Sequence, residues 1–349
     1  MAWGVARLAL ALALAAQSRP GEAFSQNDNG AWNNRFAELH GDLYTAPLPA
    51  ALESTCRNKG KAASLNQVTV TGNKRSSELL ATCGANTLCV IEGSVDVDAD
   101  WNVGALTVKG SLTLSGGHWL CAGYVVAEDA GAIKITDDAI VYIKNNGAVH
   151  DVLRTRALGS VAARGSTLKP TLDIQGNAMA RTWSLLAAPA VPGTTTIELL
   201  HDATDMGWRV GDRLAIAPTA PSQQERTEAA NIVAIDGTRV TLSAPIAAEK
   251  RAEFLATTHA ISLAAEVINL RRDILITGDP FEEIPCQSRA ALDASGPAVV
   301  SEMGESHWSG CMCTSAKQTC TMGLHTKAIG GGPVRIAHAR IETCGQRGV

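Results

Sequence analysis

The sequence predicts an all-β protein with a glycine-punctuated, β-solenoid-like domain and a small β-barrel-like module. Short runs of apolar and β-branched residues recur from residue 66 onward, separated by glycine or Asp/Asn turn signals. Helical patterns are few, and 32 of the 349 residues are glycine. A solenoid and a sandwich both fit this spacing. The aromatic content of 4% favours the solenoid, whose interior is commonly built from stacked aliphatic side chains.

The first 23 residues are predicted to be a secretory signal peptide. Residues 8–16 read LALALALAA and follow Arg7, so an apolar core stands behind a positive charge. At about 1.5 Å per residue this core is too short to span a bilayer core of about 30 Å. The mature chain is expected to begin near Phe24 and to be secreted or displayed on the cell surface. No later segment predicts a transmembrane helix.

Residues 24–65 read as a polar extension, with one short helix expected near residues 50–53. Residues 66–180 form the glycine-punctuated domain, with strands expected at 67–71, 87–91, 105–108, 111–114, 132–135 and 140–143. The turns between these strands carry Gly93, Gly104, Gly110, Gly116, Gly123, Gly131 and Gly147.

Residues 181–264 are expected to form the barrel-like module. Asp236-Gly237 stands between the strand patterns 230–235 and 239–242, which is a strong hairpin signal. Residues 265–349 contain further strands at 266–270, 274–278 and 334–341, around a long cysteine-rich loop at 279–321. Because the strand pattern breaks off after a turn near the last residue, we interpret the chain as a fragment or a truncated product.

Two elements in this region resemble a known family. They are Trp208-x-Val210-Gly211-Asp212-x-Leu214 and Arg271-Arg272-Asp273-Ile274-x-Ile276-x-Gly278-Asp279. Their order and spacing, after Trp183-Ser184-Leu185-Leu186, resemble the G8-domain proteins, which include cell-surface hyaluronidases, the hyaluronan-binding cell-migration-inducing protein and fibrocystin-like receptors. The resemblance implies a G8-type domain over 66–180 and the start of a right-handed parallel β-helix over 265–349. The loop at 286–320 departs from the family pattern.

The family resemblance leaves two functions open. One is an extracellular protein that binds or processes a glycan such as hyaluronan, in which case an enzyme would be a glycoside hydrolase-like polysaccharide depolymerase. The other is a non-catalytic adhesion or receptor-type module with a protein partner. A net charge of −4 and few aromatic residues argue against nucleic acid as a partner. The sequence has no phosphate loop, dinucleotide fingerprint or nucleophile elbow.

Acidic residues supply the first candidate sites. Asp96, Asp98 and Asp100 are spaced two apart, so on a strand their carboxylates would share one face. Such a row could hold Ca²⁺, could contain a protonated acid for a glycosidic oxygen, or could be a solvated edge. Glu128 and Asp129 precede Gly131 at a turn, where a catalytic or ligand role competes with turn capping.

The last segment supplies a further pair, His338 and Glu342, which are four residues apart and would share a face on a strand. They could line a groove that binds a glycan, or be ordinary surface polar residues. We find no row of cations along a single strand that would suit a polyanion.

Nine cysteines are present, and in an oxidising compartment they favour disulfides over zinc. Cys83 and Cys89 could close a short loop, but the sequence alone leaves the connectivity open. An odd number leaves at least one cysteine without a partner inside the chain. The disulfide candidates are Cys56, Cys83, Cys89, Cys121, Cys286, Cys311, Cys313, Cys320 and Cys344.

Overall fold

The fold was determined as a computed structural model, which describes residues 48–57, 64–219, 227–255, 261–280, 282–285 and 319–344. All of these lie in the larger of two compact units, residues 40–349. The expected signal peptide, most of the extension at 24–65, and Cys286, Cys311 and Cys313 lie outside the described residues. Over the described residues, no helix is long and apolar enough to cross a bilayer.

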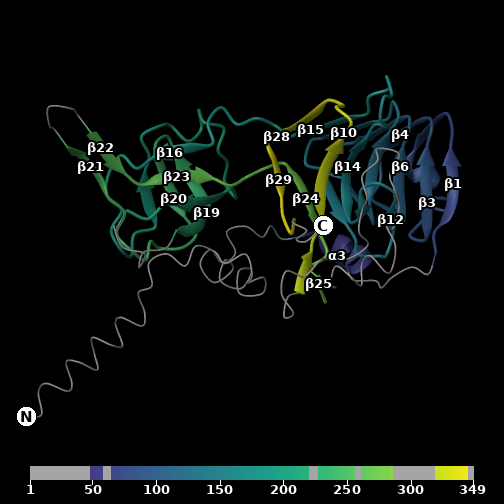
Figure 1. The fold of residues 1–349 in the computed structure, drawn as a ribbon. Coiled ribbons are helices and arrows are strands. Elements are labelled where there is room, and N and C mark those ends of the chain that lie inside the picture. Colours follow the sequence, from purple (N-terminus) through teal and green to yellow (C-terminus); the bar gives the residue numbers. More distant parts are fainter. Residues whose placement is uncertain are drawn as a thin grey trace, which may run out of the picture. The chain divides into compact units, whose positions relative to one another are not determined.

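Three parallel sheets form the main body of the protein, and the all-β prediction is confirmed (Figure 1). Sheet A contains, in order, β1 (Asn66–Val70), β3 (Thr87–Ile91), β6 (Ala105–Val108), β9 (Val125–Glu128), β14 (Ala157–Val161) and β27 (His325–Ile329). Sheet B contains β2 (Asn73–Arg75), β4 (Ser94–Val97), β7 (Ser111–Leu114), β10 (Ala132–Thr136), β15 (Thr171–Gln175) and β28 (Val334–Ala337). Sheet C contains β5 (Trp101–Asn102), β8 (Trp119–Ala122), β11 (Ile140–Ile143), β24 (Ile274–Gly278) and β29 (Ala339–Ile341).

The chain passes through sheets A, B and C in rotation, so each circuit adds one strand to each sheet. Four strands of the segment 265–349, β24 and β27 to β29, extend the same three sheets that begin at residue 66. The first circuit has the short helix α4 (Ser76–Leu79) after β2. This rotation explains why apolar runs of four to five residues recur at short intervals along the sequence.

Glycines occupy the corner between sheets A and B because neighbouring circuits touch there. A Cβ atom on Gly110 would lie 1.9 Å from the carbonyl oxygen of Gly93, and a Cβ on Gly93 would lie 2.0 Å from that of Gly72. Gly131 lies at the same corner one circuit later, and a Cβ atom added to it would lie 1.8 Å from the carbonyl oxygen of Val108. Only glycine allows this approach, which accounts for the glycine punctuation of the sequence.

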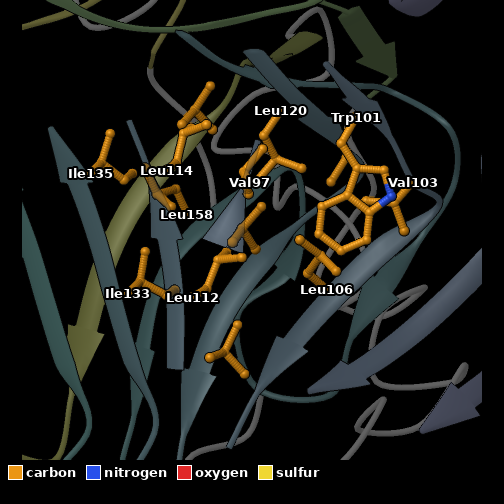
Figure 2. Close-up of a cluster of buried hydrophobic side chains, with 14 of the residues drawn as sticks. Val97, Trp101, Val103, Leu106, Leu112, Leu114, Leu120, Ile133, Ile135 and Leu158 are labelled. Atoms are coloured by element: carbon orange, nitrogen blue, oxygen red, sulfur yellow. The ribbon is translucent and has the colours of Figure 1, made fainter. Parts of the chain in front are cut away.

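The space between the three sheets is filled by stacked aliphatic side chains. Leu112 of β7 lies in register with Ile133 of β10, and Leu114 with Ile135 (Figure 2). All four are almost fully buried, and each such side chain contributes about 1.5–3 kcal/mol on leaving water. Trp101 is the large exception, and its indole nitrogen donates to the Cys83 carbonyl oxygen at 2.9 Å.

Among the described residues, two of the three outer faces are covered. Helix α3 (Ala50–Cys56) packs Leu52 against an apolar cluster on the outside of sheet C, and Cys56 is bonded to Cys121 of β8. The hairpin of β12 (Val149–His150) and β13 (Arg154–Thr155) follows β11, and its Leu153 joins an apolar cluster on the outside of sheet A.

The antiparallel module is a separate sheet formed between β15 and β24 in the chain. Its strand order is β16 (Trp183–Leu185), β23 (Glu266–Asn269), β18 (Arg213–Ile216), β19 (Glu228–Asp236), β20 (Arg239–Leu242) and β17 (Thr196–Glu198). The two edge strands meet through an antiparallel bridge between Leu186 and Leu199, so the sheet closes on itself around its own core. The expected hairpin at Asp236-Gly237 joins β19 to β20.

Two further hairpins complete the described strands. One is formed by β21 (Ala252–Leu255) and β22 (Ile261–Ala264), and the other by β25 (Glu282–Pro285) and β26 (Thr319–Met322). Cys320 lies in β26, and nothing of its side chain is described.

Candidate functional site

The outer face of sheet B carries a row of polar and charged side chains, one from each of its six strands. Successive strands place these residues opposite one another in register. We call this row the sheet B ladder, and it consists of Arg75, Asp96, Thr113, Lys134, Asp173 and Arg335. Neighbouring strands are about 4.8 Å apart, so six of them carry the row over roughly 24 Å.

The ladder faces outward because of strand alternation. In β4 the side chains of Val95 and Val97 are buried in the core, so Asp96 between them points away from it. Lys134 is exposed between the buried Ile133 and Ile135 for the same reason. The hydrophobic periodicity that builds the core therefore also sets the position of the ladder.

Hydroxyl and amide groups accompany the charged row. Ser94 and Ser111 lie in register beside the ladder, and the Ser111 hydroxyl donates to Ser94 Oγ at 2.9 Å. Thr136 and Gln175 lie in register on the other side of it. None of these side chains belongs to the apolar clusters that the described residues form, in contrast to the outer faces of sheets A and C. The face thus combines alternating charges with many hydrogen-bonding groups.

The three expected aspartates do not share a strand. Asp96 lies on β4, but this strand ends at Val97, so Asp98 and Asp100 lie in the turn that follows. The prediction of one carboxylate row is wrong because the spacing of two residues does not reveal where the strand stops. Within the residues that the structure describes, no group of three or more His, Cys, Asp or Glu side chains could hold a metal ion.

Asp98 and Asp100 each have a local structural partner. The Asp98 carboxylate accepts hydrogen bonds from the Ser77 backbone N–H and hydroxyl, both at 3.0 Å, at the start of α4. The backbone hydrogen bond of Ser77 is the main cause of the lowered pKa of Asp98. Asp100 accepts the Trp119 backbone N–H at 3.1 Å and lies 3.7 Å from His118 Nδ1.

Glu128 is held by His150, which the sequence analysis did not single out. The Nδ1 atom of His150 accepts the backbone N–H groups of Val152 and Leu153, both at 3.1 Å. The proton must therefore be on Nε2, which donates to Glu128 Oε1 at 3.1 Å. This hydrogen bond lowers the pKa of Glu128, against the opposing effect of burial. Both ring nitrogens are engaged, so the pair fastens the β12–β13 hairpin to sheet A.

Asp129 occupies the turn between sheets A and B. Its φ of 54° is in the left-handed region, which Asp tolerates better than most residues, and its half-exposed carboxylate lies 3.5 Å from Lys109 Nζ. Glu128 and Asp129 are thus adjacent in sequence but have different partners.

His338 directly precedes β29 and Glu342 directly follows it, so the two residues do not lie on one strand. His338 occupies the bend between β28 and β29 with a φ of 52°. Glu342 follows β29 and forms an ion pair with Arg340. Their expected common face is wrong because the chain turns from sheet B to sheet C between β28 and β29.

A buried polar cluster at the ends of β5, β11 and β24 was missed. Asp279 is 5% exposed and accepts the Tyr142 hydroxyl at 2.7 Å and the Asn145 N–H at 2.6 Å. Burial, together with the Asp279 carboxylate, raises the pKa of Tyr142. Lys144, also 5% exposed, donates from Nζ to Asn102 Oδ1 at 2.7 Å. The sequence did contain a signal for this cluster, because polar residues directly follow the strands that end at Ile143 and Gly278.

Four of the cysteine candidates form disulfides, Cys56–Cys121 and Cys83–Cys89. The second is the short loop that the sequence had offered as one choice. Cys344 is exposed and free in the described part of the chain. No family model matches this sequence. No curated protein matches it either.

Proposed function

We propose that this is an extracellular glycan-binding protein that holds a polysaccharide along the sheet B ladder. The observation that carries the proposal is the ladder itself, an uninterrupted row of polar and charged side chains across six parallel strands. A polysaccharide is an extended polymer of hydroxyl groups, so an extended face with hydroxyl, amide and charged groups at a regular spacing is chemically matched to it.

The cations of the ladder favour a glycan that carries carboxylate groups. Arg75, Lys134 and Arg335 are each exposed, and Lys134 and Arg335 are two strands apart, which is roughly 10 Å. Arginine can bind a carboxylate with two parallel hydrogen bonds. Asp96 and Asp173 between the cations would accept hydrogen bonds from sugar hydroxyls and would disfavour a densely charged polymer.

The finer fold assignment belongs to the same proposal. We take the three sheets, which the chain enters in rotation, to be a right-handed parallel β-helix of the G8-containing type. The resemblance of the Trp208 and Arg271 elements supports this assignment. A second support is that strands of the same three parallel sheets come both before and after the antiparallel module in the chain. The two disulfides are typical of proteins made for an oxidising compartment, which supports secretion.

Binding is favoured over cleavage. A glycosidase needs two carboxyl groups that face the same glycosidic bond. Three of the acidic candidates instead have a local partner: Glu128 has His150, Asp129 has Lys109, and Asp98 has Ser77. These contacts explain the carboxylates without a reaction.

The test is a glycan-binding screen on the secreted chain, with and without Ca²⁺, followed by sizing of any polysaccharide that binds. Lys134→Ala combined with Arg335→Ala should weaken binding at least about tenfold, since each lost charge-assisted contact is worth about 1.5–3 kcal/mol. Arg209→Ala is the matched control, because it removes an exposed arginine from the antiparallel module. The control should bind as the wild type does.

Two results would contradict the proposal. One is that the folded protein binds no glycan, and the other is that the ladder variant binds with unchanged affinity. Shortening of the polysaccharide that is lost in Asp129→Asn would instead support the depolymerase.

The second candidate, a protein-binding module, is favoured by an apolar strip on the outside of the antiparallel sheet. Trp183, Ile268, Ala215 and Ala229 lie in register across four strands. Trp183 is 43% exposed, and the Arg181 guanidinium lies 5.0 Å from its ring centroid. This function would be supported if the folded wild type binds a protein partner but no glycan, and if the Trp183→Ala variant no longer binds that partner.

A further inference from the structure

A buried lysine in the sheet C region donates a hydrogen bond to an asparagine side chain. Lys144 directly follows β11, and Asn102 ends β5, with β8 lying between these two strands in the sheet. The Lys144 Nζ atom lies 2.7 Å from Asn102 Oδ1. The Oδ1 atom is bonded to the amide carbon Cγ, so the amine is placed next to a carbonyl carbon that it could attack.

The surroundings of Lys144 favour a neutral amine. The side chain is almost wholly buried, and the apolar cluster of Leu52, Trp119 and Tyr142 covers this face of sheet C. Burial lowers the pKa of Lys144 to about 8, although the charge of Asp279 acts in the opposite direction. A desolvated lysine with a lowered pKa is the form in which this side chain acts as a nucleophile in proteins.

We propose that Lys144 and Asn102 become joined by an intramolecular isopeptide bond in the mature protein. The neutral Nζ attacks Cγ of Asn102, a bond forms between Nζ and Cγ, and the bond between Cγ and Nδ2 breaks. Nδ2 leaves as ammonia after taking a proton from the attacking nitrogen. The reaction consumes no oxidant, reductant or cofactor, because one amide replaces another.

The proton that the lysine ammonium must lose before the attack also has an acceptor. Lys144 begins as an ammonium ion and must lose one proton before it attacks. Asp279 is the carboxylate whose charge acts on this ammonium, so it can accept the proton and pass it on to the departing ammonia, which leaves as ammonium. Asp279 is held for this role by the Tyr142 hydroxyl and the Asn145 N–H.

The bond would reinforce the place where the protein is already cross-linked. Cys121 lies on β8, in register with both Asn102 and Tyr142, and is bonded to Cys56 of α3. The disulfide therefore joins α3 to β8, and the isopeptide bond would join β5 to the end of β11 across β8. Two separate cross-links, one from α3 to β8 and one from β5 to the end of β11, would then hold this part of sheet C.

The mass of the secreted wild-type protein tests the proposal directly. After reduction and alkylation of the cysteines, the intact chain should be lighter than its sequence by about 17 Da, the mass of ammonia. Proteolysis should release the peptides that contain Asn102 and Lys144 as one linked species. The control variant Lys134→Arg changes an exposed lysine, and it should show the same loss of mass as the wild type.

Two variants establish which groups react. Lys144→Arg retains the positive charge but cannot form the bond, so it should have the full sequence mass. Asn102→Asp should form the same bond with loss of water, about 18 Da. Wild-type protein at its full sequence mass, with the two peptides released separately, would overturn the proposal whether or not the variants fold.

Discussion

The Arg271 Nε atom lies 3.4 Å from Asp212 Oδ1, and this ion pair joins the two sequence elements that carry the family resemblance. The other Asp212 oxygen accepts the Asn269 amide N–H at 2.7 Å and the Arg209 backbone N–H at 2.9 Å. Arg271 also donates to the Gly207 carbonyl oxygen at 3.2 Å. Two motifs about 60 residues apart are thus the two halves of one junction in the antiparallel module.

Asp212→Ala is expected to destabilise the antiparallel module strongly. The Asp212 side chain is 5% exposed and that of Arg271 is 19% exposed, so the substitution leaves a largely buried guanidinium with only the more distant Asp273 carboxylate, at 3.9 Å. Breaking such a pair costs about 3–5 kcal/mol. Urea unfolding of the variant measures the loss, with Asp205→Ala, an exposed aspartate of the same module, as the control. A change below about 1 kcal/mol in Asp212→Ala would show that the junction is not energetically important.

Burial on both faces removes one of the signals that predict a strand from the sequence. In β7, Leu112 and Leu114 are buried and alternate with less buried residues, and this segment was predicted at its observed bounds. All positions of β8 and β14 are buried, because α3 and the β12–β13 hairpin cover their outer sides. A strand covered on both sides loses the period of two. Neither β8 nor β14 was predicted, although β6 and β24, whose positions are also all buried, were predicted at 105–108 and 274–278.

The candidate site was harder to predict because it is assembled across strands. The sequence analysis looked for cations along one strand and found no row, but the ladder takes one residue from each strand. Lys134 and Arg335 are two strands apart in sheet B, yet about 200 residues apart in the chain. Register between distant strands decides such a row, and no local pattern encodes it.

Gly110→Ala is expected to prevent correct stacking of the first three circuits. Its Cβ would lie 1.9 Å from the Gly93 carbonyl oxygen, a backbone atom that cannot move without separating two strands. We expect a loss above about 4 kcal/mol or failure to fold. Gly84→Ala is the control, because its Cβ would make only an ordinary contact at 3.6 Å. The yield of folded protein and the melting temperature give the comparison, and equal values for the two variants would contradict the stacking argument.

Removal of the Cys56–Cys121 disulfide is expected to release helix α3 from sheet C. This bond spans 65 residues, so the double variant Cys56→Ala/Cys121→Ala should lose roughly 3–5 kcal/mol. Protease cleavage within residues 48–57 should become faster. The variant Cys83→Ala/Cys89→Ala breaks a bond that spans only 6 residues and also replaces two fully buried cysteines, so it is a matched control. A greater loss in the control than in the first variant would argue against anchoring of α3.

Stability should fall as the pH is lowered from 6.5 to 4, and His325 is expected to be one cause. Burial lowers the pKa of His325 to about 4, and the positive charges of Lys327 and Arg156 act in the same direction, against a hydrogen bond with the Leu153 backbone. Between pH 4 and 6.5 the unfolded chain therefore binds a proton that the folded chain does not. The contribution is fully present above the unfolded pKa of 6.5 and is lost as the pH falls through the folded pKa of about 4.

The size of this effect follows from the shift of His325, which corresponds to roughly 3 kcal/mol across the window. Chemical unfolding at a series of pH values from 7.5 to 4 measures it in the wild type and in His325→Gln, which cannot titrate. The variant should have a flatter profile than the wild type over this range. His118→Gln, which replaces a histidine whose side chain is 36% exposed, is the matched histidine-to-glutamine control. If His325→Gln retained the same slope, the pH dependence would have to arise from other groups, and folding would not lower the pKa of His325.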